Sequence, residues 1–446
     1  MDELQHKAQV VAQVLRRYSV DAQVIPGESF QTSGMNVLSI LPGASTKVTA
    51  VTKLADELDD VLTRAVGRSV SVRFETKPLR VLVPRERPQV ADMLDVLGTV
   101  QRQLRNRRGL FALVGEAIGV RSAELCATNL AGSNAPHWLL AGMTGSGKTT
   151  ALIGMVASMA LLNTPERLTM WVLDPKNELG FLRGLPCVGR VVSDAQSCVK
   201  ALGDAVREMD RRSRHSIIDP SHRYVVVIDE LADLIDVAGS DAELLLKRIL
   251  QKGRGHGIHV IAATQHALAE NIGSTAKANF SVRLAFRTPN AEASKVATGM
   301  AALGAERLPG CGAAIKVGAR GVESVQAYNI SRERVAALGG APVQQRERTF
   351  SGVGVPQTAQ TAVETAYQTA PVPLQTAVET AVETAETGTD KLPYRMPNRK
   401  EARIIRAFYD TLGSKNAVIR ELWPNRNKAT CLQYIDAALT RQEVAP

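Results

Sequence analysis

The sequence predicts an α/β protein built on a mostly parallel sheet, with a small α+β module before it and a short helical module after it. Three observations predict this organisation. Between residues 131 and 335, short β-branched runs alternate with helical segments, which is typical of a parallel sheet covered by helices on both faces. Residues 1–130 mix helical and extended patterns. A repetitive segment then separates a basic C-terminal unit from the rest.

Length and composition bound the class of protein. With 446 residues, the chain is too long for one ordinary core and should form two or three domains. Hydrophobic residues make up 45% and charged residues 22%, which excludes a collagen-like or wholly disordered chain. The net charge of +10 favours a polyanionic partner, with nucleic acid ahead of membrane.

Cysteine usage and hydropathy indicate a cytoplasmic protein. The five cysteines are scattered without a CxxC pair or an adjacent histidine cluster, so we expect neither a disulfide framework nor a zinc site. No stretch reaches the roughly 18 apolar residues that a membrane span needs. We therefore expect a protein in the reducing cytoplasm with no membrane insertion.

The first region, residues 1–130, is expected to be a small α+β domain. Its periodicities predict an amphipathic helix, two extended stretches, a second helix with apolar spacing near 3.6, and an alternating run of strands. In order, these elements cover residues 4–18, 22–25, 36–41, 47–66 and 69–84.

The second region, residues 131–343, is expected to hold the parallel sheet. Each of its apolar runs precedes a turn and then a helix or loop, as parallel strands require. The runs are HWLLA, LTMWVLD, RYVVVID, GIHVIAA and FSVRLAF, which begin at residues 137, 168, 223, 257 and 280.

The strongest motif is GMTGSGKT at residues 142–149, which fits the Walker A pattern G-x-x-x-x-G-K-[ST] at every fixed position. Its glycines let the backbone wrap around phosphate oxygens at a helix N-terminus. Lys148 is then expected to reach the β- and γ-phosphates of ATP, and the Thr149 hydroxyl to ligate Mg²⁺. The expected nucleotide-binding residues are Gly142, Met143, Thr144, Gly145, Ser146, Gly147, Lys148, Thr149 and Thr150.

A second motif, YVVVIDE at residues 224–230, predicts a buried strand that ends in two acids at the ligand-binding edge of the sheet. Asp229 would hold Mg²⁺ through its water shell, as a Walker B aspartate does, and Glu230 would polarise the attacking water. Hydrophobic strands often end in an acid, so this motif is informative only together with the Walker A loop 81 residues upstream of Asp229.

Two further candidate site residues, Gln265 and Arg254, each have two possible roles. Gln265, in AATQ, ends a third strand, where it either senses the γ-phosphate or only caps a turn. Arg254 lies in the glycine-flanked run QKGRGHGIH, where it is either a solvated charge or an arginine finger for an adjacent subunit. Sequence spacing does not distinguish these roles.

A low-complexity segment is expected to form a flexible tether over residues 344–392. From residue 351 to residue 390 the chain repeats Gln or Glu followed by Thr-Ala, with five acidic and no basic residues. Irregular spacing, two prolines and few large side chains favour a solvated chain. The TAVETAVETAE run keeps a helical alternative, because Ala and Glu favour helix.

The last region, residues 393–446, is expected to be a small helical DNA-binding domain. Residues 391–446 hold eleven basic and five acidic residues, a net charge of +6. Apolar spacing predicts three short helices, an arrangement that resembles a helix-turn-helix or winged-helix fold. A helical protein-interaction bundle is the alternative. The expected DNA contacts on the last helix are Arg426, Asn427, Lys428 and Gln433.

The order of these motifs resembles the FtsK/SpoIIIE family of DNA translocases. The resemblance is carried by PHWLLAGMTGSGKTT, LDPK at residues 173–176, VVVIDELADL, QKGRGHGIHVIAATQ and KANFSVRLAF. LDPK and the last of these runs are more specific than a Walker pair. With GAERLPGCGAAI at residues 304–315, and with residues 8–90 similar to the small domain that precedes the family's motor, the resemblance covers about the first 335 residues.

The resemblance implies a RecA-like motor that assembles as a ring, usually a hexamer, with double-stranded DNA in its central channel. Nucleotide would lie between subunits, with Lys148, Thr149, Asp229, Glu230 and Gln265 from one subunit and Arg254 from the next. The family's DNA-contacting loops fall after Gln265 and after Phe286, where Lys277 and Lys295 match basic positions. Two family basic residues are replaced, by His266 and Ala291, so Arg283, Arg287 and the C-terminal domain are expected to share the DNA contacts.

The membrane-spanning helices of the cell-division members are missing from this sequence, which is more similar to translocases of plasmids, phages and other mobile elements. We therefore expect an ATP-dependent DNA translocase that acts in the transfer, segregation or maintenance of a chromosome or mobile element. The alternatives are a conjugative or secretion coupling ATPase, and a nucleotide-switched DNA-binding protein without motor activity.

Overall fold

The structure is a computed structural model that describes residues 2–104, 109–132, 134–217, 220–265, 279–339 and 435. The tether expected over residues 344–392 and the helical domain expected over residues 393–446 lie outside the described residues, apart from residue 435.

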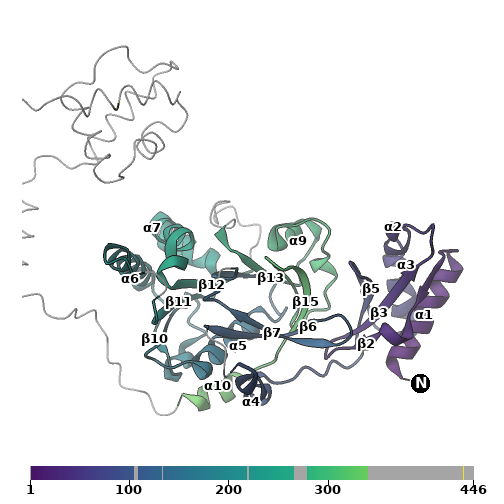
Figure 1. The fold of residues 1–446 in the computed structure, drawn as a ribbon, viewed down its shortest axis with the longest axis horizontal. Coiled ribbons are helices and arrows are strands. Elements are labelled where there is room, and N and C mark those ends of the chain that lie inside the picture. Colours follow the sequence, from purple (N-terminus) through teal and green to yellow (C-terminus); the bar gives the residue numbers. More distant parts are fainter. Residues whose placement is uncertain are drawn as a thin grey trace, which may run out of the picture. The chain divides into compact units, whose positions relative to one another are not determined.

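The N-terminal module is an antiparallel sheet with helices packed on one face (Figure 1). Its helices are α1 (Glu3–Arg17), α2 (Val48–Thr52), α3 (Ala55–Val66) and the 3₁₀ turn η1 (Pro26–Glu28). Its strands are β1 (Ala22–Val24), β2 (Phe30–Gln31), β3 (Met35–Pro42), β4 (Arg73–Thr76) and β5 (Leu79–Pro84). They run in the order β1-β3-β5-β4, with β2 also paired to β3.

The α+β character expected for the start of the chain is confirmed, with one difference in its second helix. The helix expected over residues 47–66 is divided into α2 and α3, because Leu54 leaves the helical conformation and is buried in the core of the module. The apolar stripe of α1 packs against the same core, as its periodicity predicts.

The main sheet has ten strands in the order β10-β9-β11-β12-β8-β13-β14-β15-β6-β7. Neighbouring strands from β10 to β13 are parallel, and the pairs from β13 to β7 are antiparallel. The strands are β6 (Phe111–Ile118), β7 (Ala123–Asn129), β8 (His137–Ala141), β9 (Leu168–Leu173), β10 (Val188–Val192), β11 (Arg223–Ile228), β12 (Ile258–Thr264), β13 (Val282–Phe286), β14 (Ala313–Gly318) and β15 (Gly321–Ala327).

Helices cover both faces of this sheet, which confirms the predicted α/β class. Figure 1 shows α6 and α7 on one side of it and α4, α5 and α10 on the other. Along β11, Val225 and Val227 belong to the core on the α5 side, whereas Val226 and Ile228 belong to the core under α6 and α7. The elements between strands are α4 (Met93–Leu104), α5 (Lys148–Leu162), α6 (Ala195–Arg214), α7 (Leu231–Lys252), α9 (Ala291–Thr298), α10 (Arg332–Leu338), η2 (Gly180–Gly184), η3 (Gly253–His256) and η4 (Ala305–Arg307).

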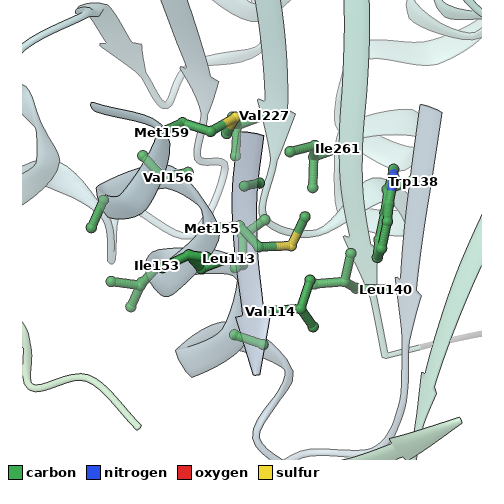
Figure 2. Packing of buried hydrophobic residues seen from close by; sticks show 14 of the residues in the cluster. Leu113, Val114, Trp138, Leu140, Ile153, Met155, Val156, Met159, Val227 and Ile261 are labelled. Atoms are coloured by element: carbon green, nitrogen blue, oxygen red, sulfur yellow. The ribbon is translucent and has the colours of Figure 1, made fainter. Parts of the chain in front are cut away.

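Helix α5 is apolar on all sides and is buried along most of its length. Figure 2 shows Met155 and Met159 among Leu140, Val227 and Ile261 from the parallel strands. On the antiparallel side, the backbone N–H of Leu113 in β6 donates to the Ser158 hydroxyl at 2.9 Å. This packing holds the start of α5, and therefore the glycine-rich loop before it, against the centre of the sheet.

The division between the two sheets does not fall at residue 130, the boundary expected from the pattern of helices and strands. Strands β6 and β7 belong to the ten-stranded sheet, because β6 pairs with β15. The sequence pattern missed this, since an antiparallel hairpin at a sheet edge looks the same whichever sheet it joins.

The N-terminal module packs on the antiparallel part of the main sheet. Met35 and Val37 of β3 share a buried cluster with Leu308 and Ile315. Arginines cross the junction. Arg80 donates to the carbonyl of Gly119 at 2.9 Å, and Arg73 donates to the Ser324 hydroxyl. Arg307 donates to the Val72 carbonyl and to the carboxylates of Asp56 and Asp59. The central strands β3 and β5 of the small sheet are therefore packed on both faces.

Candidate nucleotide-binding site

The glycine-rich loop joins β8 to α5 at the carboxyl edge of the parallel strands, as the sequence predicts. Gly145 and Gly147 have φ angles of 75° and 103°, a backbone region that side chains other than glycine rarely adopt. Gly147 is the N-cap of α5, so the free N–H groups of the first helical turn face the loop. This backbone can surround an anion such as a phosphate.

The loop is also held from its other side by the segment that precedes β14. A Cβ atom on Gly147 would lie 2.6 Å from the backbone nitrogen of Gly312, and one on Gly142 would lie 2.7 Å from Cβ of Phe286. The N–H of Gly312 donates to the Ser146 carbonyl at 2.9 Å, and the N–H of Met143 donates to the carbonyl of Arg287 at 2.9 Å. Glycine is thus required at residues 142 and 147 for close packing as well as for turning.

Lys148 begins α5 and is buried beside the acids that end β11. Its Nζ lies 3.6 Å from Oε2 of Glu230, and the two side chains are 4% and 0% exposed. Burial lowers the pKa of Lys148, although Glu230 and Asp229 act in the opposite direction. The two motifs identified 81 residues apart are therefore joined in space, with β12 between their strands.

Gln265 contacts both motifs. Its backbone N–H lies 3.0 Å from each carboxylate oxygen of Glu230, and its side-chain oxygen accepts a hydrogen bond from the Thr144 hydroxyl at 2.7 Å. Because β12 lies between β11 and β8, the residue that follows it is placed to connect the acid after β11 with the loop after β8. The Gln265 side chain therefore lies against the glycine-rich loop.

Asp229 has the features of a metal-binding carboxylate. Its side chain is 3% exposed, and among the described residues its Oδ1 has no hydrogen-bond partner. Burial raises the pKa of Asp229 despite the nearby Lys148. A hard cation such as Mg²⁺ prefers carboxylate and hydroxyl oxygens and would satisfy this atom, so Asp229 and Thr149, in the first turn of α5, fit the expected ligand pair.

The LDPK run adds a residue to the site that reasoning from single motifs did not assign. Lys176 follows β9, which pairs with β11 in parallel. Its Nζ lies 3.5 Å from Oε2 of Glu230 and 3.5 Å from Oδ2 of Asp233. The available signal was a polar run after a buried strand, because parallel neighbours end at the same edge of a sheet.

Arg254 does not lie with the other candidates. It is exposed in η3, just before β12 begins, whereas the glycine-rich loop lies where the parallel strands end. The seven residues of β12 separate these two edges by about 20 Å at the usual rise of a strand. The exposed turn expected at Arg254 is confirmed, and this separation is longer than an arginine side chain can bridge to the loop of its own chain.

The candidate DNA-binding residues are partly described. Arg287 and Lys295 are exposed. Arg283 of β13 is half-buried and donates to the carbonyl of Val296 at 3.0 Å, and burial lowers its pKa. His266, Lys277, Arg426, Asn427, Lys428 and Gln433 lie outside the described residues.

Within the described segments of the chain, no helix is both long enough and apolar enough to cross a membrane.

Comparison with known proteins shows which family the chain resembles. Residues 92–223, which include the glycine-rich loop and LDPK, match the FtsK/SpoIIIE family. The chain is 30% identical to the DNA translocase FtsK of Sporosarcina ureae over 346 residues, which is 71% of this chain and 43% of that protein. It is 29% identical to the DNA translocase FtsK of Caldanaerobacter subterraneus over 360 residues, or 75% of this chain and 48% of that protein. The chain thus spans less than half the length of these relatives.

Among solved structures, the pCW3 conjugation coupling protein TcpA in its monomer form with ATPγS matches at a TM-score of 0.49 and 18% identity, covering 75% of this chain and 99% of that one. The cytoplasmic domain of the type VII secretion ATPase EccC of Thermomonospora curvata has a TM-score of 0.46 and 24% identity, covering 55% of this chain and 33% of that one. In its motifs, their joint placement and its sequence relatives, the chain is similar to the FtsK/SpoIIIE family.

Proposed function

We propose that this chain is an ATP-driven motor that moves double-stranded DNA. One observation carries the proposal: the buried Glu230 carboxylate lies against Lys148 of the glycine-rich loop and against the backbone of Gln265. This contact supports the proposed roles of the loop in binding phosphate, of Glu230 as general base and of Gln265 as γ-phosphate sensor, because it brings the three to one sheet edge. The family relatives, which are named DNA translocases, supply the DNA substrate.

Each side chain at this edge has a chemical role. Lys148 binds the β- and γ-phosphates, and Glu230 accepts a proton from the attacking water. The backbone N–H of Gln265 holds Glu230. The side-chain amide of Gln265, which accepts a hydrogen bond from Thr144 in the loop, detects the γ-phosphate. Asp229 and Thr149 hold Mg²⁺, which neutralises charge on the phosphate oxygens when it is bound.

The proposed assembly is a ring, which we expect to be a hexamer, with nucleotide between neighbouring subunits. The position of Arg254 supports this. Its turn lies at the amino edge of β12, about 20 Å from the loop at the other edge, so an Arg254 that acts on ATP must act on the ATP of another copy.

The DNA track is proposed to contact the loops after Gln265 and Phe286. Lys277, Lys295 and His266 are the family positions there, with Arg283 and Arg287 beside them. Arg283 already donates one N–H group to Val296, so we expect the exposed Arg287 and Lys295 to contribute more. Contacts to phosphates make binding weaken steeply with salt. Residues 393–446 would load or orient the motor, in transfer, segregation or maintenance of a chromosome or mobile element.

The test measures two properties of the full chain: ATP turnover with and without duplex DNA, and displacement of a third strand from a triplex on a duplex track. We expect DNA to stimulate turnover and the triplex strand to be displaced. Lys148→Ala should abolish both. Glu230→Gln should lower kcat by about 100-fold or more while ATP binding persists, because it removes the base and keeps the shape.

Glu28→Gln, a change in an exposed glutamate of the N-terminal module, is the matched control and should leave both signals intact. Slow turnover that DNA does not change, together with no displacement of the third strand, would reject the motor and favour a nucleotide-switched DNA-binding protein. Deletion of residues 351–446 should preserve turnover and remove only site preference.

A further inference from the structure

Two lysines lie beside the carboxylate of Glu230. Its fully buried carboxylate lies 3.6 Å from Lys148 Nζ and 3.5 Å from Lys176 Nζ, and both of these atoms approach the same oxygen, Oε2. Lys148 comes from the glycine-rich loop and Lys176 from the turn after β9. The two lysines follow β8 and β9, which lie on opposite sides of the β11-β12 pair, so the carboxylate is held from both sides.

The turn that carries Lys176 is rigidly built. Asp174 is fully buried, and its two carboxylate oxygens accept the N–H groups of Glu178 at 3.0 Å and Leu179 at 2.7 Å. Its carbonyl accepts the N–H of Asn177 at 2.9 Å. In addition, β9 is tied to β11 beyond its last pair, because the N–H of Asp229 donates to the carbonyl of Leu173 at 3.1 Å. These bonds fix the backbone of the turn that carries Lys176 beside the end of β11, where Glu230 lies.

Asp233 gives Lys176 a second partner. Its Oδ2 lies 3.5 Å from Lys176 Nζ, and it stands in the first turn of α7, three residues after Glu230. Lys176 is 28% exposed and Asp233 38%, so this contact is at the rim of the site. Burial lowers the pKa of Lys176, but Glu230 and Asp233 outweigh it and raise the pKa above that of a free lysine. Lys176 is therefore charged at neutral pH.

Lys148 and Lys176 are expected to differ in whether they keep Glu230 as a partner when ATP binds. A lysine of a glycine-rich loop pairs with the β- and γ-phosphates, so Lys148 has to exchange Glu230 for phosphate. Lys176 has no such competitor in its own turn. A buried carboxylate that loses its only cationic partner is strongly destabilised, and a carboxylate that shifts by about 1 Å loses about 100-fold in rate.

We propose that Lys176 is a positioning residue for Glu230: it retains the carboxylate at the edge of the sheet when Lys148 turns to the phosphates. Asp233 keeps Lys176 at that edge and stops it from following Lys148 towards the nucleotide. This inference rests on the proposed ATPase function and adds a residue to it. Lys176 acts through Glu230 and does not contact ATP.

The experiment compares four full-length variants with the wild type: Lys176→Met, Lys176→Arg, Asp233→Asn, and Lys200→Met as the control. Lys200 is an exposed lysine of α6 outside the site. The measurements are kcat and KM for ATP turnover, the Kd of a fluorescent ATP analogue, and the thermal unfolding midpoint of each variant.

We expect Lys176→Met to lower kcat by about 10- to 100-fold, with KM and the analogue Kd within about 3-fold of wild type, because only the base is displaced. Lys176→Arg should recover most of kcat, since it restores the charge. Asp233→Asn should lower kcat by less than Lys176→Met, and Lys200→Met should change nothing.

Three results would overturn the inference. One is a kcat for Lys176→Met within about 2-fold of wild type, in a chain whose unfolding midpoint shows that it is folded. Another is a loss of analogue affinity in parallel with kcat, which would make Lys176 a nucleotide ligand. The third is an Arg variant that folds and is as impaired as the Met variant. A wild-type turnover that DNA fails to stimulate would instead reject the motor, and the ratio of basal kcat values would still decide the role of Lys176.

Discussion

The two ends of β8 and β12 bury polar groups in different ways. At the carboxyl end, Lys148, Glu230 and Asp229 are all at most 4% exposed, and the lysine and the glutamate face each other. At the amino end, His137 and His259 are each 1% exposed, with ring centroids 6.4 Å apart. Burial lowers the pKa of His137 to about 4 and that of His259 to about 3.

The difference shows where this sheet can accept a charged ligand. Charges are buried at the carboxyl end because each has an opposite charge or a backbone N–H beside it. The histidines remain neutral because no carboxylate is among the groups that shift them, and three of their four ring nitrogens have no partner among the described residues. At the carboxyl end, buried charged side chains are paired with one another and can exchange these partners for a charged ligand. At the amino end, the two buried histidines stay neutral.

The largest predicted effect tests whether Arg254, at the amino end of β12, acts on ATP bound at the carboxyl end of a neighbouring copy of the chain. Arg254→Ala should lower ATP turnover by about 1,000-fold, the scale on which an arginine finger contributes. The same variant mixed with Lys148→Ala should recover measurable turnover, because an intact loop from one chain can then meet an intact arginine from the other. Turnover is measured across a titration of the two variants.

Arg214→Ala, which changes an exposed arginine at the end of α6, is the matched control and should keep wild-type turnover. If the mixture of the two inactive variants never exceeds the sum of the separate variants, Arg254 does not act on a neighbouring chain.

An intermediate effect is predicted for the neutral histidines. Their folded pKa values lie below the unfolded value of about 6.5, so the unfolded chain binds more protons in mild acid. The stabilisation is complete above pH 6.5 and is lost as the pH falls towards 4. At pH 5, each histidine should lower the free energy of unfolding by about 2 kcal/mol. Urea unfolding at pH 7.5 and pH 5 measures this loss.

His137→Leu should reduce that acid-induced loss by about half, because it removes one of two titrating rings. His215→Leu, at an exposed histidine, should leave the loss unchanged. Equal pH dependence in wild type and His137→Leu would show that the ring at residue 137 is not a source of acid sensitivity.

The smallest predicted effect concerns the junction between the N-terminal module and the rest of the described chain. Arg307 donates to the Val72 carbonyl at 2.8 Å, to Asp56 at 3.0 Å and to Asp59 at 2.6 Å. Burial raises the pKa of Asp59, and the Val72 N–H and Arg307 counteract this. Arg307→Ala should therefore lower the free energy of unfolding by about 1 to 3 kcal/mol, as measured by urea denaturation.

Arg64→Ala is the comparison, because Arg64 pairs with Asp60 at 2.6 Å while both side chains are more than half exposed. It should cost less than about 1 kcal/mol. A smaller loss for Arg307→Ala than for Arg64→Ala would mean that the bonds of Arg307 to the module contribute little to stability.

Short-range patterns along the sequence determined the elements and the chemistry of the loop. The alternation of β-branched runs with helices predicted the parallel strands, and GMTGSGKT placed Lys148 and Thr149 at a helix start, because strand periodicity and left-handed glycines are local properties. The tether, the C-terminal domain and most DNA contacts remain predictions.

Only the tertiary structure decided which strand ends are neighbours. The order β9-β11-β12-β8 brings residues 148, 176, 230 and 265 together and leaves Arg254 at the other edge. Likewise, only pairing with β15 assigned β6 and β7 to the main sheet. The physical reason is that hydrogen bonds between strands join residues far apart in the chain, and no local pattern of polarity encodes which distant strand is the partner.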